Sequence, residues 1–480
     1  MRRLNTLLAT AVVTTLALTG PAGATGGGET SWVGTWSTAV TGPALPPQPQ
    51  TVFADQTLRQ IVHVSTAGSQ LRVRLSNEYG TEPFVIGEAR IARRPTGATG
   101  SQIVPGTDRA LSFGGRGSTS IPPGAPTLSD PVKLSVPALS DLAISIYLPG
   151  RTPAATVHGS AFQRNFIAAG NVTRSAELTG ATETTSYHFL SGVSVTSSHS
   201  SSAGLSAGDL SSGASSSGGS SSGASSSGGS SSESSSSGGS GAGGSGAVVA
   251  FGDSITDGAI TTIDANHRWP DFLARRLQAD RKLRSLGVLN KGIGGNRLLH
   301  DGNTLEGTSF AGLGPLFGDS ALSRFDRDVA AQPGARYVVV LLGINDIGQP
   351  GSTSPESEAV TVDELIGAYR QLISRAHERG LLIYGATLTP FQDTTIPGYY
   401  SAANEQKRQA VNRWIRTSGE WDAVIDFDRA VRDPGQPLRM LPAYDSGDHL
   451  HPNDAGMSAM ADAIPLRLFS RKTSSLHAGA

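Results

Sequence analysis

Val-Val-Ala-Phe-Gly-Asp-Ser-Ile-Thr-Asp-Gly, residues 248–258, is the stretch that most restricts the fold of this chain. The apolar run 247–251 predicts a short buried strand, and Gly252 allows a sharp turn at its end. Ser254 is then expected at the carboxyl edge of a sheet with its backbone N–H free. In open α/β sheets this edge is where ligands bind. An isolated Gly-Asp-Ser also fits an ordinary turn with a serine N-cap. The choice between such a turn and a functional site therefore depends on the motifs in the rest of the chain.

Strand and helix patterns alternate after this stretch. Thr361 and Glu364 have the spacing of a capping box, and Gly380 lies where a C-cap glycine is expected. Continuous apolar strands between helices predict a parallel sheet that is covered on both faces. We predict strands at 247–251, 287–290, 336–342, 381–387 and 423–427, and helices near 269–278, 320–331, 362–379, 402–416 and 452–469.

The part of the chain before residue 197 has the pattern of an all-β domain. Leu71, Val73 and Leu75 alternate with polar residues, and Gly/Pro-rich turns separate several such segments. This pattern predicts a β-sandwich. Four aromatic side chains of this domain could stack on sugars, although packing is the more frequent role of such residues. They are Trp32, Trp36, Tyr79 and Tyr147. Strands are predicted at 58–64, 71–76, 84–91, 141–148 and 186–195.

The two ends and the middle of the chain have distinct compositions. Arg2 and Arg3, an apolar run and the sequence Ala22-Gly-Ala24 fit a secretory signal peptide. Between 197 and 246 the chain is almost entirely serine and glycine, with the decamer 211–220 repeated at 221–230, which predicts a disordered linker. The predicted organisation is a signal at 1–24, an all-β domain at 25–196, a linker at 197–246, a catalytic domain at 247–472 and a tail at 473–480.

Composition excludes several classes of function. Lys and Arg total 38 against 39 Asp and Glu, and no basic block is present, which argues against a nucleic-acid partner. The absence of cysteine excludes disulfides, thiolate metal sites and cysteine nucleophiles. After the signal, no stretch has the roughly 18 apolar residues that a membrane span needs. We expect a secreted protein without integral membrane association, and a monomer.

Three further polar clusters follow predicted strands. The segment Asn290–Asn296 contains three glycines, and Asn345 follows the strongly apolar run 337–342. Asn345 could donate its amide to an anion at the sheet edge. Each cluster alone is also explained by the chemistry of turns.

The last cluster is Asp448-His-Leu-His-Pro452. A carboxylate three residues before His451 can bind one ring nitrogen and leave the other free, as a general base requires. Pro452 predicts that the final helix begins directly after this histidine. His449 competes for the role, but we expect it to face another direction in the same turn.

The four clusters together, in this order, resemble the conserved blocks of the SGNH hydrolases, also called the GDSL esterase/lipase family. The resemblance covers about Ala247 to Phe469, with Ile255 where the family name has leucine. It implies an α/β fold of the flavodoxin-like three-layer type. The preceding β-region resembles, more loosely, the N-terminal domain of some exported actinobacterial members.

Carried over residue by residue, the resemblance implies a serine hydrolase mechanism. Ser254 would be the nucleophile, with Asp448 and His451 completing the catalytic triad. The oxyanion hole would be formed by Ser254, Gly295 and Asn345. The resemblance implies no metal and no cofactor.

The function predicted from these residues is that of a secreted serine esterase or lipase. The alternative is a carbohydrate esterase that deacetylates polysaccharide, with the β-domain as a sugar-binding module. A glycosidase needs two carboxylates across a cleft, and Asp253 and Asp257 near Ser254 have no partner cluster. A pure binding protein fits the N-terminal half better than the whole chain. The loops 299–318 and 391–400 are expected to line the substrate site, and no lid-like amphipathic helix is evident.

Overall fold

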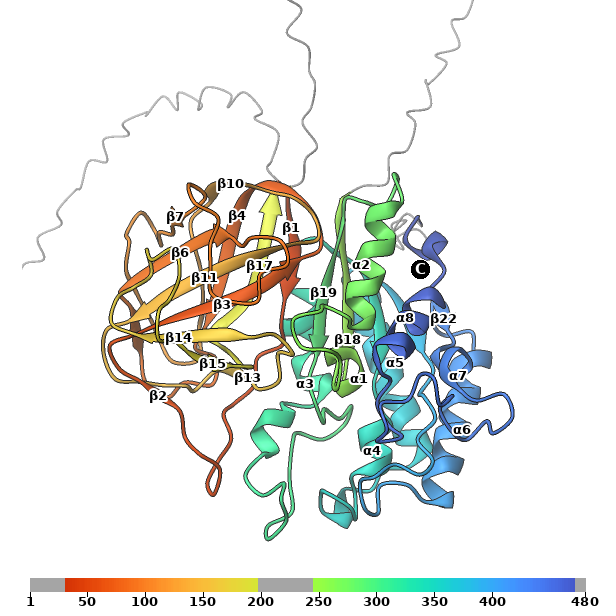
Figure 1. Ribbon diagram of the computed structural model, residues 1–480. Helices are drawn as coiled ribbons and strands as arrows, with labels where there is room; N and C mark the ends of the chain where they lie inside the picture. Colours follow the sequence, from red (N-terminus) through yellow and green to blue (C-terminus); the bar gives the residue numbers. More distant parts are fainter. Residues whose placement is uncertain (1–30, 197–244, 471–480) are drawn as a thin grey trace, which may run out of the picture.

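The computed structural model describes residues 31–196 and 245–470 (Figure 1). The predicted signal peptide, nearly all of the Ser/Gly linker and the predicted tail lie outside these residues. A β-rich body formed by the N-terminal part lies beside an α/β body formed by the C-terminal part (Figure 1). Within the described residues, no helix combines the length and apolar character needed to cross a membrane.

The N-terminal part consists mostly of antiparallel strands, so the predicted all-β fold is confirmed. A five-stranded sheet has the order β1-β17-β4-β10, with β9 also paired to β4, and a six-stranded sheet has the order β15-β14-β3-β11-β6-β7. Apolar side chains from both sheets form one buried core between them. The strands of these two sheets are β1 (Trp32–Ser37), β3 (Gln56–Val64), β4 (Gly68–Ser76), β6 (Glu88–Arg93), β7 (Arg109–Ala110), β9 (Pro126–Leu128), β10 (Val132–Val136), β11 (Ser140–Leu148), β14 (Asn165–Ala169), β15 (Thr182–Thr184) and β17 (Leu190–Thr196).

Two strands predicted in this domain are each divided in the structure. The predicted strand 84–91 breaks at Gly87, where the chain passes from β5 to β6 in a different sheet. The predicted strand 186–195 breaks at Phe189, whose φ of 60° is incompatible with a continuous strand. The remaining short strands form three separate pairs: β2 (Val52–Phe53) with β12 (Thr152–Pro153), β5 (Phe84–Ile86) with β8 (Thr119–Ile121), and β13 (Val157–His158) with β16 (Tyr187–His188).

The C-terminal part contains the predicted parallel sheet. Its order is β19-β18-β20-β21-β22, and every neighbouring pair is parallel. The interior strand β18 is buried along its whole length, as a strand covered on both faces must be. The strands are β18 (Gly246–Gly252), β19 (Leu286–Gly292), β20 (Ala335–Leu341), β21 (Leu382–Ala386) and β22 (Ala423–Ile425).

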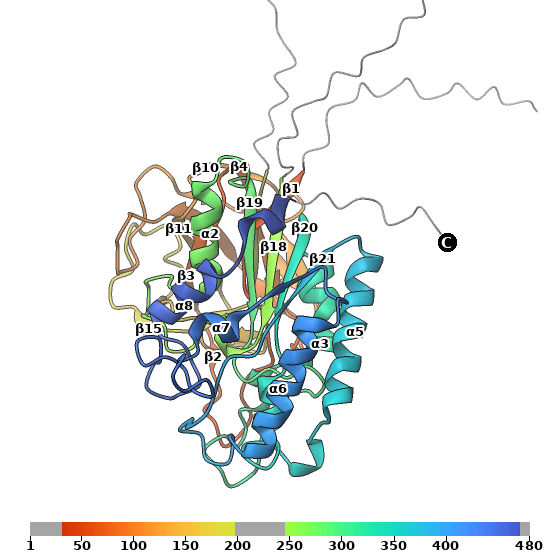
Figure 2. The same ribbon diagram turned by 90° about the vertical axis from the view of Figure 1, so that its right-hand side faces the viewer.

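Helices cover both faces of this sheet and complete a three-layer sandwich. Helices α2, α7 and α8 lie on one side, and α3, α5 and α6 lie on the other (Figure 2). The three-layer α/β prediction is therefore confirmed. The α-helices are α1 (Ser254–Asp257), α2 (Trp269–Ala279), α3 (Ala321–Phe325), α4 (Ile344–Gly348), α5 (Val362–Glu378), α6 (Ala402–Thr417), α7 (Phe427–Val431) and α8 (Asp454–Asp462).

Two predicted helices differ from the structure. The predicted helix 320–331 is α-helical only in α3 and continues as a π-helical turn at Asp326–Ala330. The predicted final helix 452–469 begins later and ends earlier, as α8. Asn453 caps α8 by accepting a hydrogen bond from the N–H of Gly456, so Pro452 is not its first residue. Pro465 then prevents continuation because it lacks an N–H, and a 3₁₀ turn follows at Leu466–Ser470.

The two bodies pack tightly against each other through β1 and β19. A Cβ atom on Gly287 would lie 2.0 Å from the carbonyl oxygen of Gly34, so this approach requires glycine. The N–H of Gly34 also donates to the carbonyl of Pro333 at 2.8 Å. Val33 of β1 belongs to the core of the α/β body. The β-domain is thus a packed neighbour of the predicted catalytic domain.

Candidate active site

Ser254 lies at the carboxyl end of β18, as predicted. It is the first residue of the short helix α1, and Asp253 is the N-cap, accepting a hydrogen bond from the N–H of Ile255 at 3.0 Å. Gly252 is required at the turn because a Cβ atom there would lie 2.0 Å from the Thr256 hydroxyl. Ser254 therefore does not act as the cap, and its side chain is available to other partners.

His451 and Asp448 complete a hydrogen-bonded chain with Ser254. The Nε2 atom of His451 lies 2.8 Å from the Ser254 Oγ, and its Nδ1 lies 2.5 Å from an Asp448 carboxylate oxygen. Because a carboxylate only accepts, Nδ1 carries the hydrogen and Nε2 is free to accept the serine proton. The structure thus brings together the three residues that the sequence singled out.

The Asp448 carboxylate is held in its ionised form. Burial by itself would raise the pKa of Asp448, but hydrogen bonds and the charge of the His451 ring hold that pKa well below its usual range. The backbone N–H groups of Leu450 and His451 donate to the same carboxylate, and so does the Ser446 hydroxyl. A permanently charged carboxylate can keep the imidazole in one orientation and stabilise its protonated form.

The His449 ring is bound to a different carboxylate from that of His451. The φ of His449 is 58°, and its Nδ1 lies 2.5 Å from the Asp445 carboxylate. The turn before α8 therefore contains two His–Asp pairs of equal length, and only that of His451 reaches the serine. His449 and Asp445 provide a natural internal control for the candidate triad.

The two other predicted oxyanion residues lie next to each other. Gly295 has a φ of 74° in the loop after β19, and its N–H has no hydrogen-bond partner within residues 31–196 and 245–470. Asn345, on the first turn of α4, donates through Nδ2 to the carbonyl of Asn296 at 3.0 Å. The second hydrogen of this amide is available to another acceptor.

Two residues that the sequence analysis did not single out fix the Asn345 amide. The Tyr399 hydroxyl donates to the Asn345 Oδ1 at 2.8 Å, and Gln349 Nε2 donates to the same atom at 3.1 Å. Gln349 Nε2 also donates to the carbonyl of Gly295 at 2.8 Å. Since Oδ1 is occupied by two donors, Nδ2 must point toward the glycine loop.

The loop 391–400, predicted to line the substrate site, contains two core residues, and its role toward substrate stays a prediction. Phe391 and Tyr399 are buried and pack edge-to-face, and a Cβ atom on Gly348 would lie 2.2 Å from the Tyr399 ring. The Tyr399 ring therefore packs directly against α4, and Phe391 packs on that ring. Helix α4 itself was not predicted, so the i, i+4 relation between Asn345 and Gln349 could not be recognised in advance.

The two carboxylates nearest to Ser254 have structural partners. Asp253 caps α1, and burial raises the pKa of Asp253 to about 7. Asp257 accepts hydrogen bonds from the ring of His158 at 2.9 Å and from the N–H of Gly294 at 3.2 Å. A glycosidase pair across a cleft gains no support from either residue. Among the described residues no group of three or more His, Asp or Glu is placed to hold a metal ion.

Comparison with known protein families finds a match within the α/β domain. Residues 250–459 match the GDSL-like Lipase/Acylhydrolase family. No curated protein matches the chain. Solved structures that resemble it include an acetylxylan esterase from Geobacillus stearothermophilus, with 21% identity over 49% of this chain and 100% of that one and a TM-score of 0.34.

Two other solved structures also resemble this chain. A GDSL-like lipase from Bacteroides thetaiotaomicron shares 19% identity over 45% of this chain and 84% of its own, with a TM-score of 0.32. A carbohydrate acetylesterase from Sinorhizobium meliloti shares 13% identity over 45% of this chain and 95% of its own, with a TM-score of 0.33. The family match identifies the α/β domain as that of a carboxylic ester hydrolase.

Proposed function

We propose that this chain, whose residues 250–459 form a GDSL-like lipase/acylhydrolase domain, is a secreted esterase that uses Ser254, His451 and Asp448 as a catalytic triad. The observation that carries the proposal is the continuous hydrogen-bonded chain from the Ser254 hydroxyl to the Asp448 carboxylate. Secretion is supported by the signal-like composition of residues 1–24.

The proposed reaction is a two-step acyl transfer. The Ser254 Oγ attacks the ester carbonyl carbon while the Nε2 of His451 takes the hydroxyl proton. His451 then donates that proton to the departing alkoxide, and the alcohol leaves an acyl-enzyme. Water attacks the acyl group with His451 as general base, the proton returns through the imidazole to Oγ, and the acid is released. Asp448 stays ionised throughout and stabilises the imidazolium.

The negative charge on the tetrahedral oxygen needs donors placed before the reaction. The N–H groups of Ser254 and Gly295 and the free amide hydrogen of Asn345 are the proposed donors. The packing of Tyr399 and Gln349 against Asn345 supports this role, since donors that do not reorganise stabilise the transition state most.

Replacing Asn345 by alanine is expected to lower kcat by about 100-fold or more with little change in KM, because one oxyanion donor is lost. Steady-state kinetics on p-nitrophenyl acetate and a thermal melt measure both effects. Asn171→Ala is the matched control, since Asn171 is an exposed asparagine of the β-domain whose amide donates to Glu88, and its loss should leave kcat unchanged. A raised KM with an unchanged kcat would instead make Asn345 a substrate-binding residue.

The alternative function, a carbohydrate esterase with a sugar-binding β-domain, rests on aromatic side chains. Two of the four have packing or interface contacts. Trp36 packs edge-to-face on Tyr187, and the Tyr79 hydroxyl donates to Asp319 at 2.6 Å across the domain interface. Tyr147 is bound through its hydroxyl to Asp55. The contacts of Trp36 and Tyr79 therefore favour packing over sugar binding, and we retain the simple esterase as the main proposal.

A substrate panel separates the two candidates. We expect hydrolysis of p-nitrophenyl esters, with kcat/KM falling as the acyl chain lengthens, and weak release of acetate from acetylated xylan and pectin. A higher kcat/KM on acetylated xylan than on p-nitrophenyl acetate would favour the carbohydrate esterase. No turnover of any ester by the folded protein would contradict the proposed function.

A further inference from the structure

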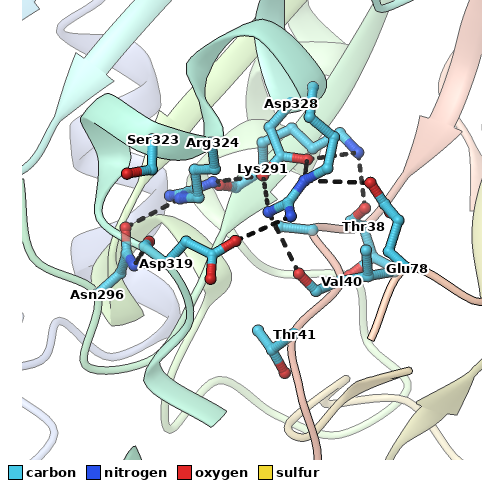
Figure 3. A network of polar contacts seen from close by, with 12 residues as sticks. Thr38, Val40, Thr41, Glu78, Lys291, Asn296, Asp319, Ser323, Arg324 and Asp328 are labelled. Carbon is cyan, nitrogen blue, oxygen red and sulfur yellow. Dashed lines mark hydrogen bonds and ion pairs between the residues drawn. The ribbon is translucent and has the colours of Figure 1, made fainter. Parts of the chain in front are cut away.

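A segment of the β-domain, Thr38–Thr41, runs beside the loop that carries the proposed oxyanion donor (Figure 3). Its carbonyl groups accept hydrogen bonds from side chains around that loop. The Lys291 Nζ donates to the carbonyl of Thr38 at 2.7 Å, and the ring of His158 donates through Nδ1 to the carbonyl of Ala39 at 2.8 Å. A backbone carbonyl of the β-domain, that of Thr38, is therefore bound directly by a side chain at the start of the loop.

His158 also reaches into the α/β domain. Its Nε2 lies 2.9 Å from one oxygen of Asp257, and the other oxygen of Asp257 accepts the N–H of Gly294 at 3.2 Å. Asp257 is only three residues from Ser254, and Gly294 immediately precedes Gly295. A short chain of contacts thus connects the β-domain to the proposed oxyanion hole.

The hydrogen-bond partners of His158 require a protonated ring. A carbonyl oxygen and a carboxylate are both acceptors, so both ring nitrogens must donate. Burial alone would lower the pKa of His158, but the charge of Asp257 and the two hydrogen bonds outweigh it and raise that pKa. The ring and the carboxylate form a buried ion pair with every polar atom of the imidazole satisfied, the case in which removing one partner is most costly.

We propose that His158 is a positioning residue for the oxyanion loop, and that the β-domain is thereby part of the catalytic framework. By fixing Asp257, His158 holds the N–H of Gly294 and so sets the direction of the Gly295 N–H. This inference rests on the proposed function for its catalytic consequence, but the positioning itself is independent of any substrate.

A second buried network holds other residues of the loop (Figure 3). Arg324 donates to the Asn296 side chain at 3.0 Å and to the carbonyl of Gly252, at the end of β18, at 2.8 Å. Asp328 binds Arg324 at 3.1 Å and lies 3.7 Å from the Lys291 Nζ. Burial would raise the pKa of Asp328, but the three cationic side chains around this carboxylate lower its pKa to about 2.

Close packing couples the start of the loop to α1, so that a change at Asp257 is passed on to the loop. A Cβ atom on Gly292 would lie 2.2 Å from the backbone nitrogen of Asp257, so α1 and the start of the loop touch directly. With Arg324 fixing Asn296, a shift of Asp257 is transmitted mainly to Gly294 and Gly295. A misplacement of about 1 Å in a catalytic group can cost about 100-fold in rate.

The test compares three variants of the full-length protein. His158→Ala removes both hydrogen bonds, His158→Gln can restore one donor to Asp257, and His63→Gln is the matched control. His63 makes a similar His–Asp pair, 2.7 Å from Asp141, but this pair lies wholly within the β-domain. Hydrogen exchange of peptides covering residues 291–298 reports on the loop whether or not the protein hydrolyses esters, and kcat and KM report on catalysis.

We expect His158→Ala to exchange faster at 291–298 and to lose about 10- to 100-fold in kcat with KM changed less than about two-fold. His158→Gln should lie between this variant and the wild type, and His63→Gln should match the wild type in both measurements. If the alanine variant does not fold, the glutamine variant gives the same comparison. Unchanged exchange at 291–298 in a folded His158 variant, or an equal loss of kcat in His63→Gln, would overturn the inference. Absence of esterase activity in the wild type would contradict only the proposed function, because the exchange data would still decide the positioning role.

Discussion

Replacing Ser254 by alanine is expected to remove ester hydrolysis almost completely. Without the Oγ no acyl-enzyme can form, and loss of a serine nucleophile typically costs about 10⁶-fold in kcat. The fold should be preserved, since Asp253 and not Ser254 caps α1. Turnover of p-nitrophenyl acetate together with a thermal melt measures both properties.

Ser352→Ala is a suitable control for this experiment. Ser352 is a surface serine whose hydroxyl donates only to the carbonyl of Pro397 among the described residues. It should retain full activity. A Ser254→Ala variant with more than about one per cent of wild-type kcat would contradict the assignment of the nucleophile.

The second large effect is expected for His451. His451→Ala should be as damaging as Ser254→Ala, and the double variant should be no worse than either, because nucleophile and base act as a unit. His449→Ala removes the other His–Asp pair of the same turn and should keep most of the activity, since the His449 ring is bound to Asp445. The comparison uses kcat/KM on one soluble ester for all variants.

The two histidines therefore test the geometry of the turn as well as the chemistry. Both pairs have the same 2.5 Å separation, but only the His451 ring contacts Ser254, and the His449 ring is the more exposed of the two. Loss of activity in His449→Ala with a functional His451→Ala would transfer the role of the base to His449 and separate Asp448 from catalysis.

The architecture of the α/β domain could be predicted because its signals are local. Apolar runs fixed the positions of β18 and β20 to within one residue, and the capping box of Thr361 and Glu364 is present at the start of α5. The ends of two helices were less predictable. The π-helical turn after Phe325 and the late start of α8 at Asp454 depend on local hydrogen bonds that periodicity does not reveal.

The candidate site was partly predictable for a similar reason. Ser254, His451 and Asp448 each belong to a short motif, and the structure brings them within hydrogen-bonding distance. Gln349 and Tyr399 have no motif, because they act only through contact with Asn345. His158 lies 99 residues from Asp257 in the chain, so its role depends on how the two domains pack. Their catalytic and positioning roles remain predictions.

The central claim, that Ser254 is an activated nucleophile, is tested most directly by labelling with a fluorophosphonate followed by peptide mapping. The probe requires both a reactive serine and its general base. We predict one adduct, on the peptide containing Ser254, with no labelling of Ser254→Ala and strongly slowed labelling of His451→Ala. An adduct on a different serine, or labelling that persists in Ser254→Ala, would contradict the account.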